Sequence, residues 1–126
     1  MHTGSCQCGA VTFELTGELA PPSACHCGQC RRMSGHVWAS THVPRSQCRI
    51  TRDDGLSWYH SSDIARRGFC GTCGSVLFWD PVDEDAISIS MGALDAPTGL
   101  TLARHIFVAD KGDYYQITDP LPQRAH

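Results

Sequence analysis

The sequence lacks the features that mark membrane-spanning, secreted and nucleic-acid-binding proteins. No apolar run approaches the ~20 residues needed to cross a bilayer, and the first residues carry neither a basic segment nor the apolar stretch of a secretory signal. No Asn-x-Ser/Thr glycosylation site occurs. Lys and Arg total 10 against 13 Asp and Glu, which is too few for the basic surface that nucleic acids require. We therefore expect a cytoplasmic protein with neither a membrane nor a nucleic acid as partner.

Helical periodicity is also missing, because no segment repeats its apolar residues every 3.6 positions. Apolar and polar residues alternate instead, which predicts short strands at 11–15, 36–43, 48–51, 56–60, 76–79, 87–91 and 105–108. Turn-forming residues between them include 21–22, 53–55 and 80–81. The Cys- and Gly-rich stretch 25–35 is expected to form neither helix nor strand. With 126 residues and no linker, the chain is expected to be one all-β domain spanning residues 1–126.

Cysteine is the residue that the sequence has in excess, with eight in 126 positions. Clustered thiols in a reducing compartment are more often metal ligands than disulfides, and zinc takes thiolates that lie a few residues apart on tight turns. Soft thiolates favour zinc or an iron–sulfur cluster over hard cations. Seven of the eight form three such groups: Cys6 and Cys8; Cys25, Cys27 and Cys30; and Cys70 and Cys73. The eighth, Cys48, is expected to be a small buried apolar residue.

The spacing of the seven clustered cysteines leaves their division among sites open. Two groups of two make a closed site of four thiolates, from Cys6, Cys8, Cys70 and Cys73. The remaining group of three then has an open fourth position, as reactive zinc sites do. Other divisions are open as well, such as Cys6 and Cys8 with Cys27 and Cys30, or a second closed site completed by His26, His36 or Cys48. A disulfide framework, a thioredoxin-like Cys-x-x-Cys motif and an iron–sulfur cluster are further alternatives.

The charge of a three-thiolate site indicates what it can do. Zn²⁺ with three thiolates is formally −1, so it should lower the pKa of bound water less than a zinc held by three neutral imidazoles does. Such a site suits an incoming thiolate better than it suits the generation of hydroxide. The group of three therefore predicts a site for a small thiol and argues against a hydrolase.

Several motifs of the chain resemble the glutathione-dependent formaldehyde-activating enzyme family, which includes the animal centromere protein V. The resemblance covers nearly the whole chain, from about residue 4 to 122. The motifs are Cys6-Gln7-Cys8-Gly9, then Cys25-His26-Cys27-Gly28-Gln29-Cys30-Arg31-Arg32 with Ser34-Gly35, then Gly68-Phe69-Cys70-Gly71-Thr72-Cys73-Gly74-Ser75, and later Gly92-Ala93-Leu94-Asp95-Ala96-Pro97 and His105-Ile106-Phe107-Val108.

The resemblance implies a fold of several small coiled antiparallel sheets in a tent-like arrangement, with two zinc ions. The structural zinc would be held by Cys6, Cys8, Cys70 and Cys73, and the catalytic zinc by Cys25, Cys27 and Cys30. The activity it implies is that of a carbon–sulfur lyase, which in the synthetic direction condenses glutathione with formaldehyde to S-hydroxymethylglutathione.

Three further residues lie beside the implied catalytic cysteines. His26, between two of them, is a candidate to tune the site or carry a proton. Arg31 and Arg32 are candidates to bind a substrate carboxylate. We expect an enzyme that joins a small thiol such as glutathione to a small aldehyde. The alternatives are a non-enzymatic zinc-binding module, in which metals replace a larger core, and a protein that releases zinc in response to a thiol.

Overall fold

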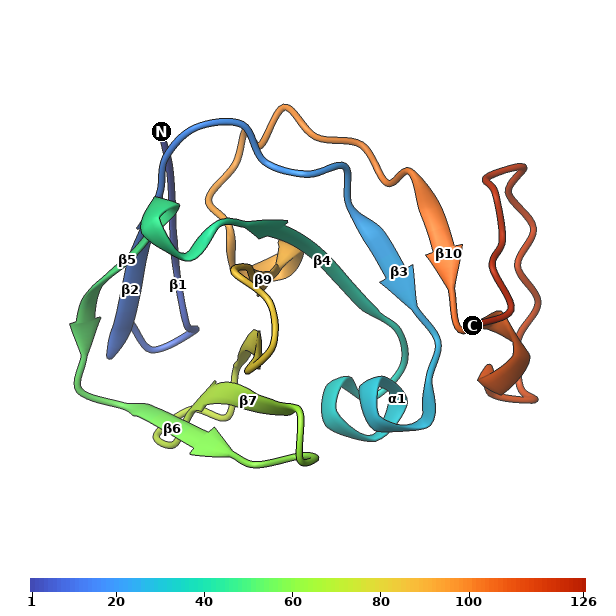
Figure 1. Cartoon of the computed structure of the whole chain (residues 1–126), viewed down its shortest axis with the longest axis horizontal. Coiled ribbons are helices and arrows are strands. Elements are labelled where there is room, and N and C mark those ends of the chain that lie inside the picture. Colours follow the sequence, from blue (N-terminus) through green and yellow to red (C-terminus); the bar gives the residue numbers. More distant parts are fainter. The chain divides into compact units, whose positions relative to one another are not determined.

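The structure is a computed structural model that describes all 126 residues. The chain, drawn in Figure 1, forms two compact units. The first unit contains Met1–Ala20 and Thr41–Gly99, and the second contains Pro21–Ser40 and Leu100–His126. None of the helices combines the length and the apolar character that crossing a membrane requires.

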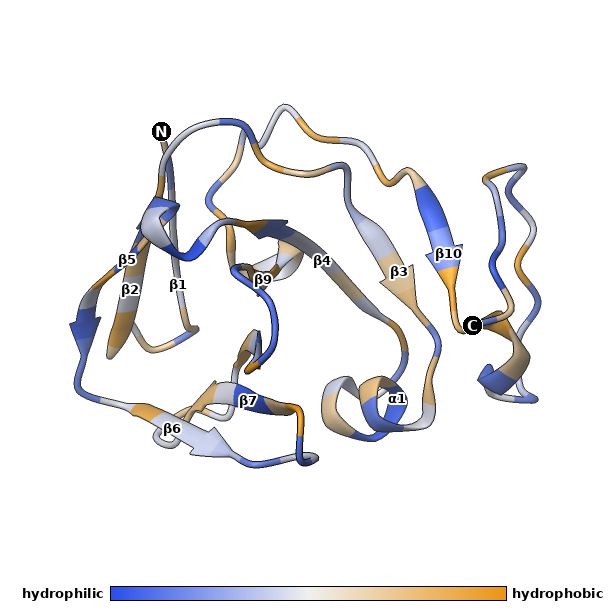
Figure 2. Ribbon diagram, viewed as in Figure 1, coloured by the Kyte–Doolittle hydropathy of each residue, from blue (hydrophilic) through white to orange (hydrophobic).

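A three-stranded antiparallel sheet in the first unit has the order β1-β2-β5, with β1 at His2–Ser5, β2 at Val11–Leu15 and β5 at Cys48–Asp53. The alternation in β2 points Val11, Phe13 and Leu15 inward, where each is at most 1% exposed. Figure 2 colours each residue of the ribbon by its hydropathy. Gly4 faces Phe13 across the β1–β2 pair. A Cβ at this position would lie 2.4 Å from the Phe13 ring, so the close approach of the two strands requires glycine.

Four more strands of the first unit are neighbours in the order β9-β8-β7-β6, all antiparallel. They are β6 (Leu56–Tyr59), β7 (Ala65–Cys70), β8 (Val76–Pro81) and β9 (Ile87–Ser90). The rings of Phe13 and Phe78 meet edge to face with centroids 5.3 Å apart, and Leu77 and Ile89 are fully buried beside them in the core. Burying each such side chain stabilises the fold by about 1.5–3 kcal/mol. Two 3₁₀ turns, at Arg45–Gln47 and Met91–Ala93, complete the unit.

The second unit is built around β3 (Ser23–Cys25), which pairs parallel with β10 (Arg104–Ile106) and antiparallel with the beginning of β4 (Trp38–Val43). Helix α1 (Gly28–Ser34) connects β3 to β4. A 3₁₀ turn at Val108–Asp110 follows β10. The C-terminal segment then returns beside β10, where His105 exchanges backbone hydrogen bonds of 2.9 Å with Pro122 and Arg124 (Figure 1).

The structure confirms the all-β prediction, with several sheets, and six of the seven predicted strands match an observed strand closely. The seventh, predicted at 105–108, corresponds to β10, which begins one residue earlier and ends at Ile106. Strands β1, β3 and β7 were not predicted. The turn predicted at 80–81 is wrong, because β8 continues through Pro81 and the chain turns after it.

The prediction that 25–35 forms neither helix nor strand is wrong, because β3 ends at Cys25 and α1 begins at Gly28. The Cys27 thiol caps the helix by accepting a hydrogen bond from the Cys30 backbone N–H at 3.3 Å. Gly35 ends it in the left-handed conformation. A sulfur in the capping role usually filled by Ser, Thr, Asp or Asn explains why the helix is not evident from the sequence.

Two candidate metal centres

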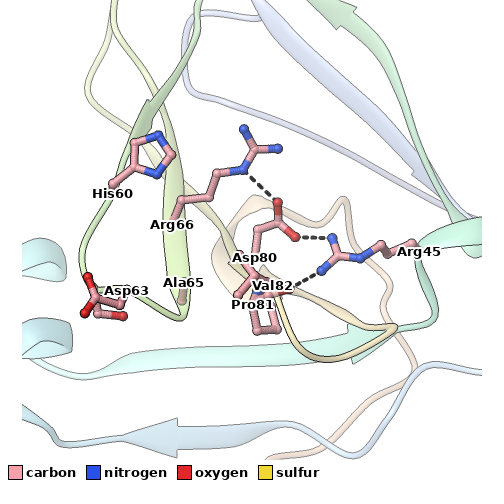
Figure 3. A pocket seen from close by; sticks show the side chains of 9 residues that line it. Arg45, His60, Asp63, Ala65, Arg66, Asp80, Pro81 and Val82 are labelled. Carbon is pink, nitrogen blue, oxygen red and sulfur yellow. Dashed lines mark hydrogen bonds and ion pairs between the residues drawn. The ribbon is translucent and has the colours of Figure 1, made fainter.

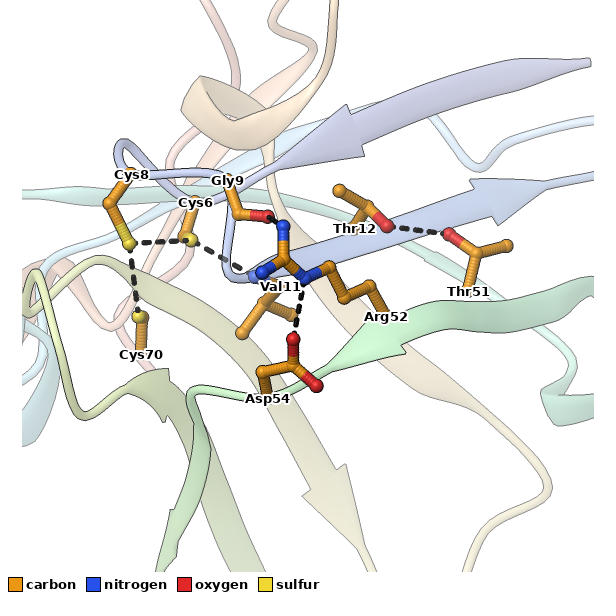
Figure 4. A network of polar contacts seen from close by, with 9 residues as sticks. All are labelled: Cys6, Cys8, Gly9, Val11, Thr12, Thr51, Arg52, Asp54 and Cys70. Carbon is orange, nitrogen blue, oxygen red and sulfur yellow. Dashed lines mark hydrogen bonds and ion pairs between the residues drawn. The ribbon is translucent and has the colours of Figure 1, made fainter.

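The first candidate metal centre lies in the first unit, where two turns bring four cysteines together. Cys6 and Cys8 follow β1, Cys70 ends β7, and Cys73 lies in the turn before β8. Their four sulfur atoms lie within 4.8 Å of one another. The Cys6 and Cys8 sulfurs are 3.7 Å apart and the Cys8 and Cys70 sulfurs 3.8 Å apart (Figure 4).

These sulfur–sulfur distances fit a metal site. Four thiolates arranged tetrahedrally at ~2.3 Å from a zinc ion are separated by about 3.8 Å, which is the spacing observed. Gly9 and Gly74 follow the two cysteine pairs with φ of +81° and +83°, a conformation that other residues adopt only with strain. The tight turns that gather the thiols therefore depend on these two glycines, and the cluster could hold a metal ion.

Hydrogen-bond donors surround the sulfurs of this cluster. The Val11 backbone N–H donates to the Cys6 sulfur at 3.2 Å, and the Ser75 hydroxyl lies 3.2 Å from the Cys73 sulfur. Hydrogen bonding by Ser75 lowers the pKa of Cys73 to about 5. The pKa of Cys8 is instead raised to about 11: a hydrogen bond from the Ala10 backbone favours its thiolate, but burial and the neighbouring thiols outweigh that bond. Within this cluster, Cys73 therefore loses its proton more readily than Cys8 does.

The second candidate metal centre lies in the second unit and consists of three cysteines. Cys25 ends β3, Cys27 caps α1, and Cys30 lies in the first turn of the helix. Their sulfurs also lie within 4.8 Å of one another, with Cys25 and Cys30 buried and Cys27 half-buried. The hydrogen bond with Cys30, followed by burial, raises the pKa of Cys25.

No fourth ligand completes this group of three in the structure. His26 is not available to the group, because its Nδ1 lies 2.5 Å from the Tyr115 hydroxyl and its Nε2 lies 2.8 Å from Nδ1 of His105. Neither His36 nor Cys48 joins the group. Cys48 lies half-buried at the start of β5, and burial raises its pKa to about 11. If these three thiols hold a metal ion, they would supply three of its ligands and leave a fourth position open.

Polar side chains of the second unit form a buried network beside the three cysteines. His26 is 2% exposed and His105 is 6% exposed. Nε2 of His105 lies 2.9 Å from the Asp119 carboxylate. Burial and then the charge of His105 lower the pKa of His26. The pKa of Tyr115 is raised, chiefly by burial, and the charges of Arg31 and Cys25 also affect it, which places its hydroxyl in their electrostatic range.

The two candidate anion-binding arginines have different surroundings. Arg31 is half-buried in α1, and its Nε is a buried donor without a hydrogen-bond partner. Arg32 is exposed. The Lys111 ammonium donates to the Tyr115 carbonyl at 2.6 Å and lies 4.9 Å from the centroid of its ring. Of these cations, only Arg31 has a buried donor left to satisfy, and an acceptor such as a carboxylate would satisfy it.

The first unit also contains a pocket that none of the clustered cysteines lines. Asp80, which is 8% exposed, pairs with Arg45 and Arg66 from opposite sides (Figure 3). The Arg66 guanidinium also lies 3.8 Å from the centroid of the Trp58 ring. The Arg66–Asp80 distance is 2.8 Å. The pocket contains no cysteine; its lining residues are Arg45, His60, Ser62, Asp63, Ala65, Arg66, Asp80, Pro81 and Val82.

The sequence profile of the glutathione-dependent formaldehyde-activating enzyme family matches residues 1–110. The chain belongs to this family. All seven clustered cysteines lie inside the matched region, whereas Tyr115 and Asp119 lie beyond it. The family match thus covers both clusters, but it does not extend to the residues that contact His26 and His105 from the C-terminal segment.

Individual family relatives are distant in sequence. An uncharacterized lyase of Schizosaccharomyces pombe is 24% identical over 123 residues, covering 94% of this chain and 86% of the relative. A Halomonas elongata protein, described as a candidate glutathione-dependent formaldehyde-activating enzyme, is 27% identical over 132 residues, covering 90% and 79%. The crystal structure of a Rhodobacter sphaeroides protein has the same fold, with a TM-score of 0.63 and 23% identity over 96% of this chain and 98% of that one.

The structure gathers all the cysteines singled out in the sequence and adds residues that the sequence did not indicate. It divides the seven into groups of four and three; their roles as metal ligands stay a prediction. Sequence reasoning missed Tyr115, His105 and Asp119 as neighbours of His26. Of these three residues, only His105 belongs to a motif that resembles the family. Sequence spacing does not connect His26 with Tyr115, which is 89 positions away, or with His105, which is 79 positions away.

Proposed function

We propose that the chain is a zinc-dependent carbon–sulfur lyase that, in the synthetic direction, condenses glutathione or a similar small thiol with formaldehyde or a similar small aldehyde. The observation that carries the proposal is the incomplete shell of Cys25, Cys27 and Cys30 in a member of this family. The names of the two relatives, a lyase and a glutathione-dependent formaldehyde-activating enzyme, support the same reaction class. The complete set of Cys6, Cys8, Cys70 and Cys73 would hold a second, structural zinc.

A zinc ion held by the three cysteines would lower the pKa of a thiol at its fourth position and keep it deprotonated near neutral pH. In the overall reaction, a C–S bond forms between the thiol sulfur and the aldehyde carbon. The π electron pair of the carbonyl moves to its oxygen, and the proton lost from the thiol ends on that oxygen. Atoms and charge balance without any redox partner.

The side chains around the three cysteines would bind and orient the thiol substrate. The unpartnered Nε of Arg31 is suited to a carboxylate of a glutathione-like molecule. His26, buried between two of the proposed ligands, would shape the site through its contact with the Tyr115 hydroxyl. Holding the thiol in one orientation beside the aldehyde supplies the proximity on which such an addition depends.

The rate of adduct formation tests the proposal. Zinc-loaded protein is mixed with glutathione and formaldehyde, and the S-hydroxymethyl signal is followed by NMR against the uncatalysed reaction. Cys27→Ser is the informative variant, because serine is a good helix N-cap and so removes the sulfur while keeping α1 capped. We expect the acceleration to be lost in Cys27→Ser and kept in Cys48→Ser, since Cys48 lies in neither cluster.

Two results would contradict the proposal. The absence of acceleration by the wild-type protein would leave a zinc-binding module without this enzymatic activity. Release of zinc on addition of glutathione alone, measured with a chromogenic chelator, would support a thiol-responsive zinc-release protein instead.

A further inference from the structure

A chain of hydrogen bonds in the second unit joins Asp119 to Tyr115, both in the C-terminal segment, through His105 and His26, and His26 lies between Cys25 and Cys27 in the sequence. The Asp119 carboxylate lies 2.9 Å from Nε2 of His105, and Nδ1 of His105 lies 2.8 Å from Nε2 of His26. Nδ1 of His26 then lies 2.5 Å from the Tyr115 hydroxyl. Each histidine uses both ring nitrogens in the chain, so the chain has two ends, a carboxylate and a phenol.

The carboxylate end fixes the direction of every bond in the chain. Hydrogen bonding by the Leu121 backbone and by His105 lowers the pKa of Asp119, so its carboxylate is ionised at neutral pH and can only accept hydrogen bonds. Nε2 of a neutral His105 must therefore carry the proton, and its Nδ1 is an acceptor. The same reasoning gives His26 a proton on Nε2, and its bare Nδ1 accepts from the Tyr115 hydroxyl.

Burial of the two histidines favours this arrangement over one with charged rings. Removing an imidazolium from water is costly, and His26 and His105 are almost fully buried. The pKa of Tyr115 is raised, so its hydroxyl keeps the proton that it donates to His26. Because that proton is committed to His26, the remaining lone pair of the Tyr115 oxygen can only accept a hydrogen bond.

We propose that Asp119 is a positioning residue which, through His105 and His26, fixes the Tyr115 hydroxyl as a hydrogen-bond acceptor beside the three-cysteine cluster. The acceptor would recognise a donor on the substrate, such as an amide N–H of a glutathione-like thiol or the hydroxyl of its aldehyde adduct. This role for Tyr115 rests on the proposed function, whereas the direction of the hydrogen bonds does not.

The backbone of the C-terminal segment holds Asp119 in the required place. The Leu121 N–H donates to Oδ1 of Asp119 at 3.0 Å, and the backbone of His105 bonds to Pro122 and Arg124 on the same segment. The matched family region ends at residue 110. The segment that orients Tyr115 therefore lies outside the region that the family profile matches, and it is a place where substrate preference can be set.

Asp119→Asn tests the direction of these hydrogen bonds, because it replaces one accepting carboxylate oxygen by a donating NH₂ group while the side chain keeps nearly the same shape. The asparagine carbonyl can keep the bond from Leu121 while its NH₂ group donates to Nε2 of His105. The protons of both histidines would then move to Nδ1, and His26 would donate to Tyr115. Asp113→Asn, an exposed position of the same segment, is the control with the same loss of charge.

Nitrogen-15 NMR of the histidine rings in the zinc-loaded protein distinguishes these states. We expect His26 and His105 to carry their protons on Nε2 in the wild type and in Asp113→Asn, and on Nδ1 in Asp119→Asn. A wild-type His105 protonated on Nδ1 or on both nitrogens, or unchanged tautomers in Asp119→Asn, would overturn the proposal. Should Asp119→Asn fail to fold, the wild-type spectrum alone still decides the direction.

The adduct-forming rate distinguishes this proposal from the proposed function. We expect Asp119→Asn and Tyr115→Phe each to lower kcat about 10- to 100-fold, and the double variant to lower it no further, because both act through one hydroxyl. Losses that multiply in the double variant would overturn the role of Asp119 as a positioning residue. If the wild type forms no adduct, the proposed function fails and the assigned role of Tyr115 fails with it, while the NMR result still decides the direction of the chain.

Discussion

The two cysteine clusters connect the chain in different ways. In the first unit, Cys8 meets Cys70, which is 62 positions away in the sequence. In the second unit, all three cysteines come from residues 25–30. Linking distant segments removes far more freedom from the unfolded chain than linking close neighbours does. A metal ion is therefore expected to stabilise the fold mainly through the first cluster, and to perform chemistry mainly at the second.

The groups around the two clusters support the same distinction between a cluster that stabilises the fold and a cluster that performs chemistry. Around the first, the sulfurs receive hydrogen bonds from the Val11 backbone and the Ser75 side chain, which only stabilise thiolates. In the second unit, His26, which lies between Cys25 and Cys27 in the sequence, contacts a phenol and, through His105, a carboxylate. Buried groups of this kind are found where a protein must orient a reactant. The complete cluster thus resembles a structural element and the incomplete one a reaction site.

The largest difference between the clusters is expected in thermal stability when one cysteine is removed from each cluster in turn. Cys70→Ser replaces a fully buried thiol of the first cluster and should abolish its metal binding, which contributes several kcal/mol to small metal-dependent folds. We expect the thermal midpoint to fall by about 10 °C or more, since each kcal/mol lost shifts it by about 4 °C. Cys27→Ser should lower it by much less. Thermal unfolding followed by circular dichroism measures both, and equal shifts would remove the distinction between the clusters.

The next effect concerns substrate binding by the second unit. Arg31→Gln removes the guanidinium whose Nε is buried without a partner, so the KM for glutathione should rise about tenfold, as expected for loss of one charge-assisted hydrogen bond. Arg32 is exposed, and Arg32→Gln is the matched control, with KM close to that of the wild type. Steady-state kinetics at fixed formaldehyde decides between them. An equal rise in both variants would indicate a general effect of positive charge.

A smaller effect is expected in the pH dependence of the second unit. The pKa of Asp119 is lowered below the ordinary value of 3.8, so its contribution to folding is present above that value and is lost as the pH falls through the lowered pKa. The contact between Asp119 and His105 should thus persist at pH 4. Carbon-13 NMR of the Asp119 carboxyl gives the titration midpoint, and a midpoint at or above 3.8 would contradict the contact.

The smallest effect separates two glycines, one beside each cluster. Gly74 has φ +83°, so Gly74→Ala should destabilise the protein by about 1 kcal/mol through backbone strain. Gly28, at the start of α1, has no positive φ, and a Cβ there would meet only Arg31 Nη2 at 4.0 Å. Gly28→Ala is therefore expected to be neutral or to stabilise by up to about 1 kcal/mol. Urea unfolding measures the free energy of unfolding of both variants. A stabilising Gly74→Ala would show that the backbone of the turn at Cys73 and Gly74 does not require glycine.

Local patterns in the sequence predicted much of the fold and part of the site. The alternation of Val11, Phe13 and Leu15 identified β2, and the spacing of the cysteines identified the three groups of two, three and two, because each of these signals lies within a few residues. The spacing left the division into four and three open; the family resemblance implied it, and the tertiary structure brings the sulfurs together in these two groups. Helix α1 was missed since its cap is the Cys27 sulfur, and Asp119 was missed because it meets its partner His105 only after the C-terminal segment folds back.

The most direct test of the difference between the clusters is cadmium-113 NMR of protein in which both sites carry ¹¹³Cd²⁺ in place of zinc. We predict two resonances, one from the four thiolates of the first unit and one from the three of the second. Addition of glutathione should shift the second resonance, because a further thiolate enters its open position, and leave the first unchanged. A single four-thiolate resonance, or a glutathione-dependent shift of the first resonance, would contradict the assignment of a closed site and an open one.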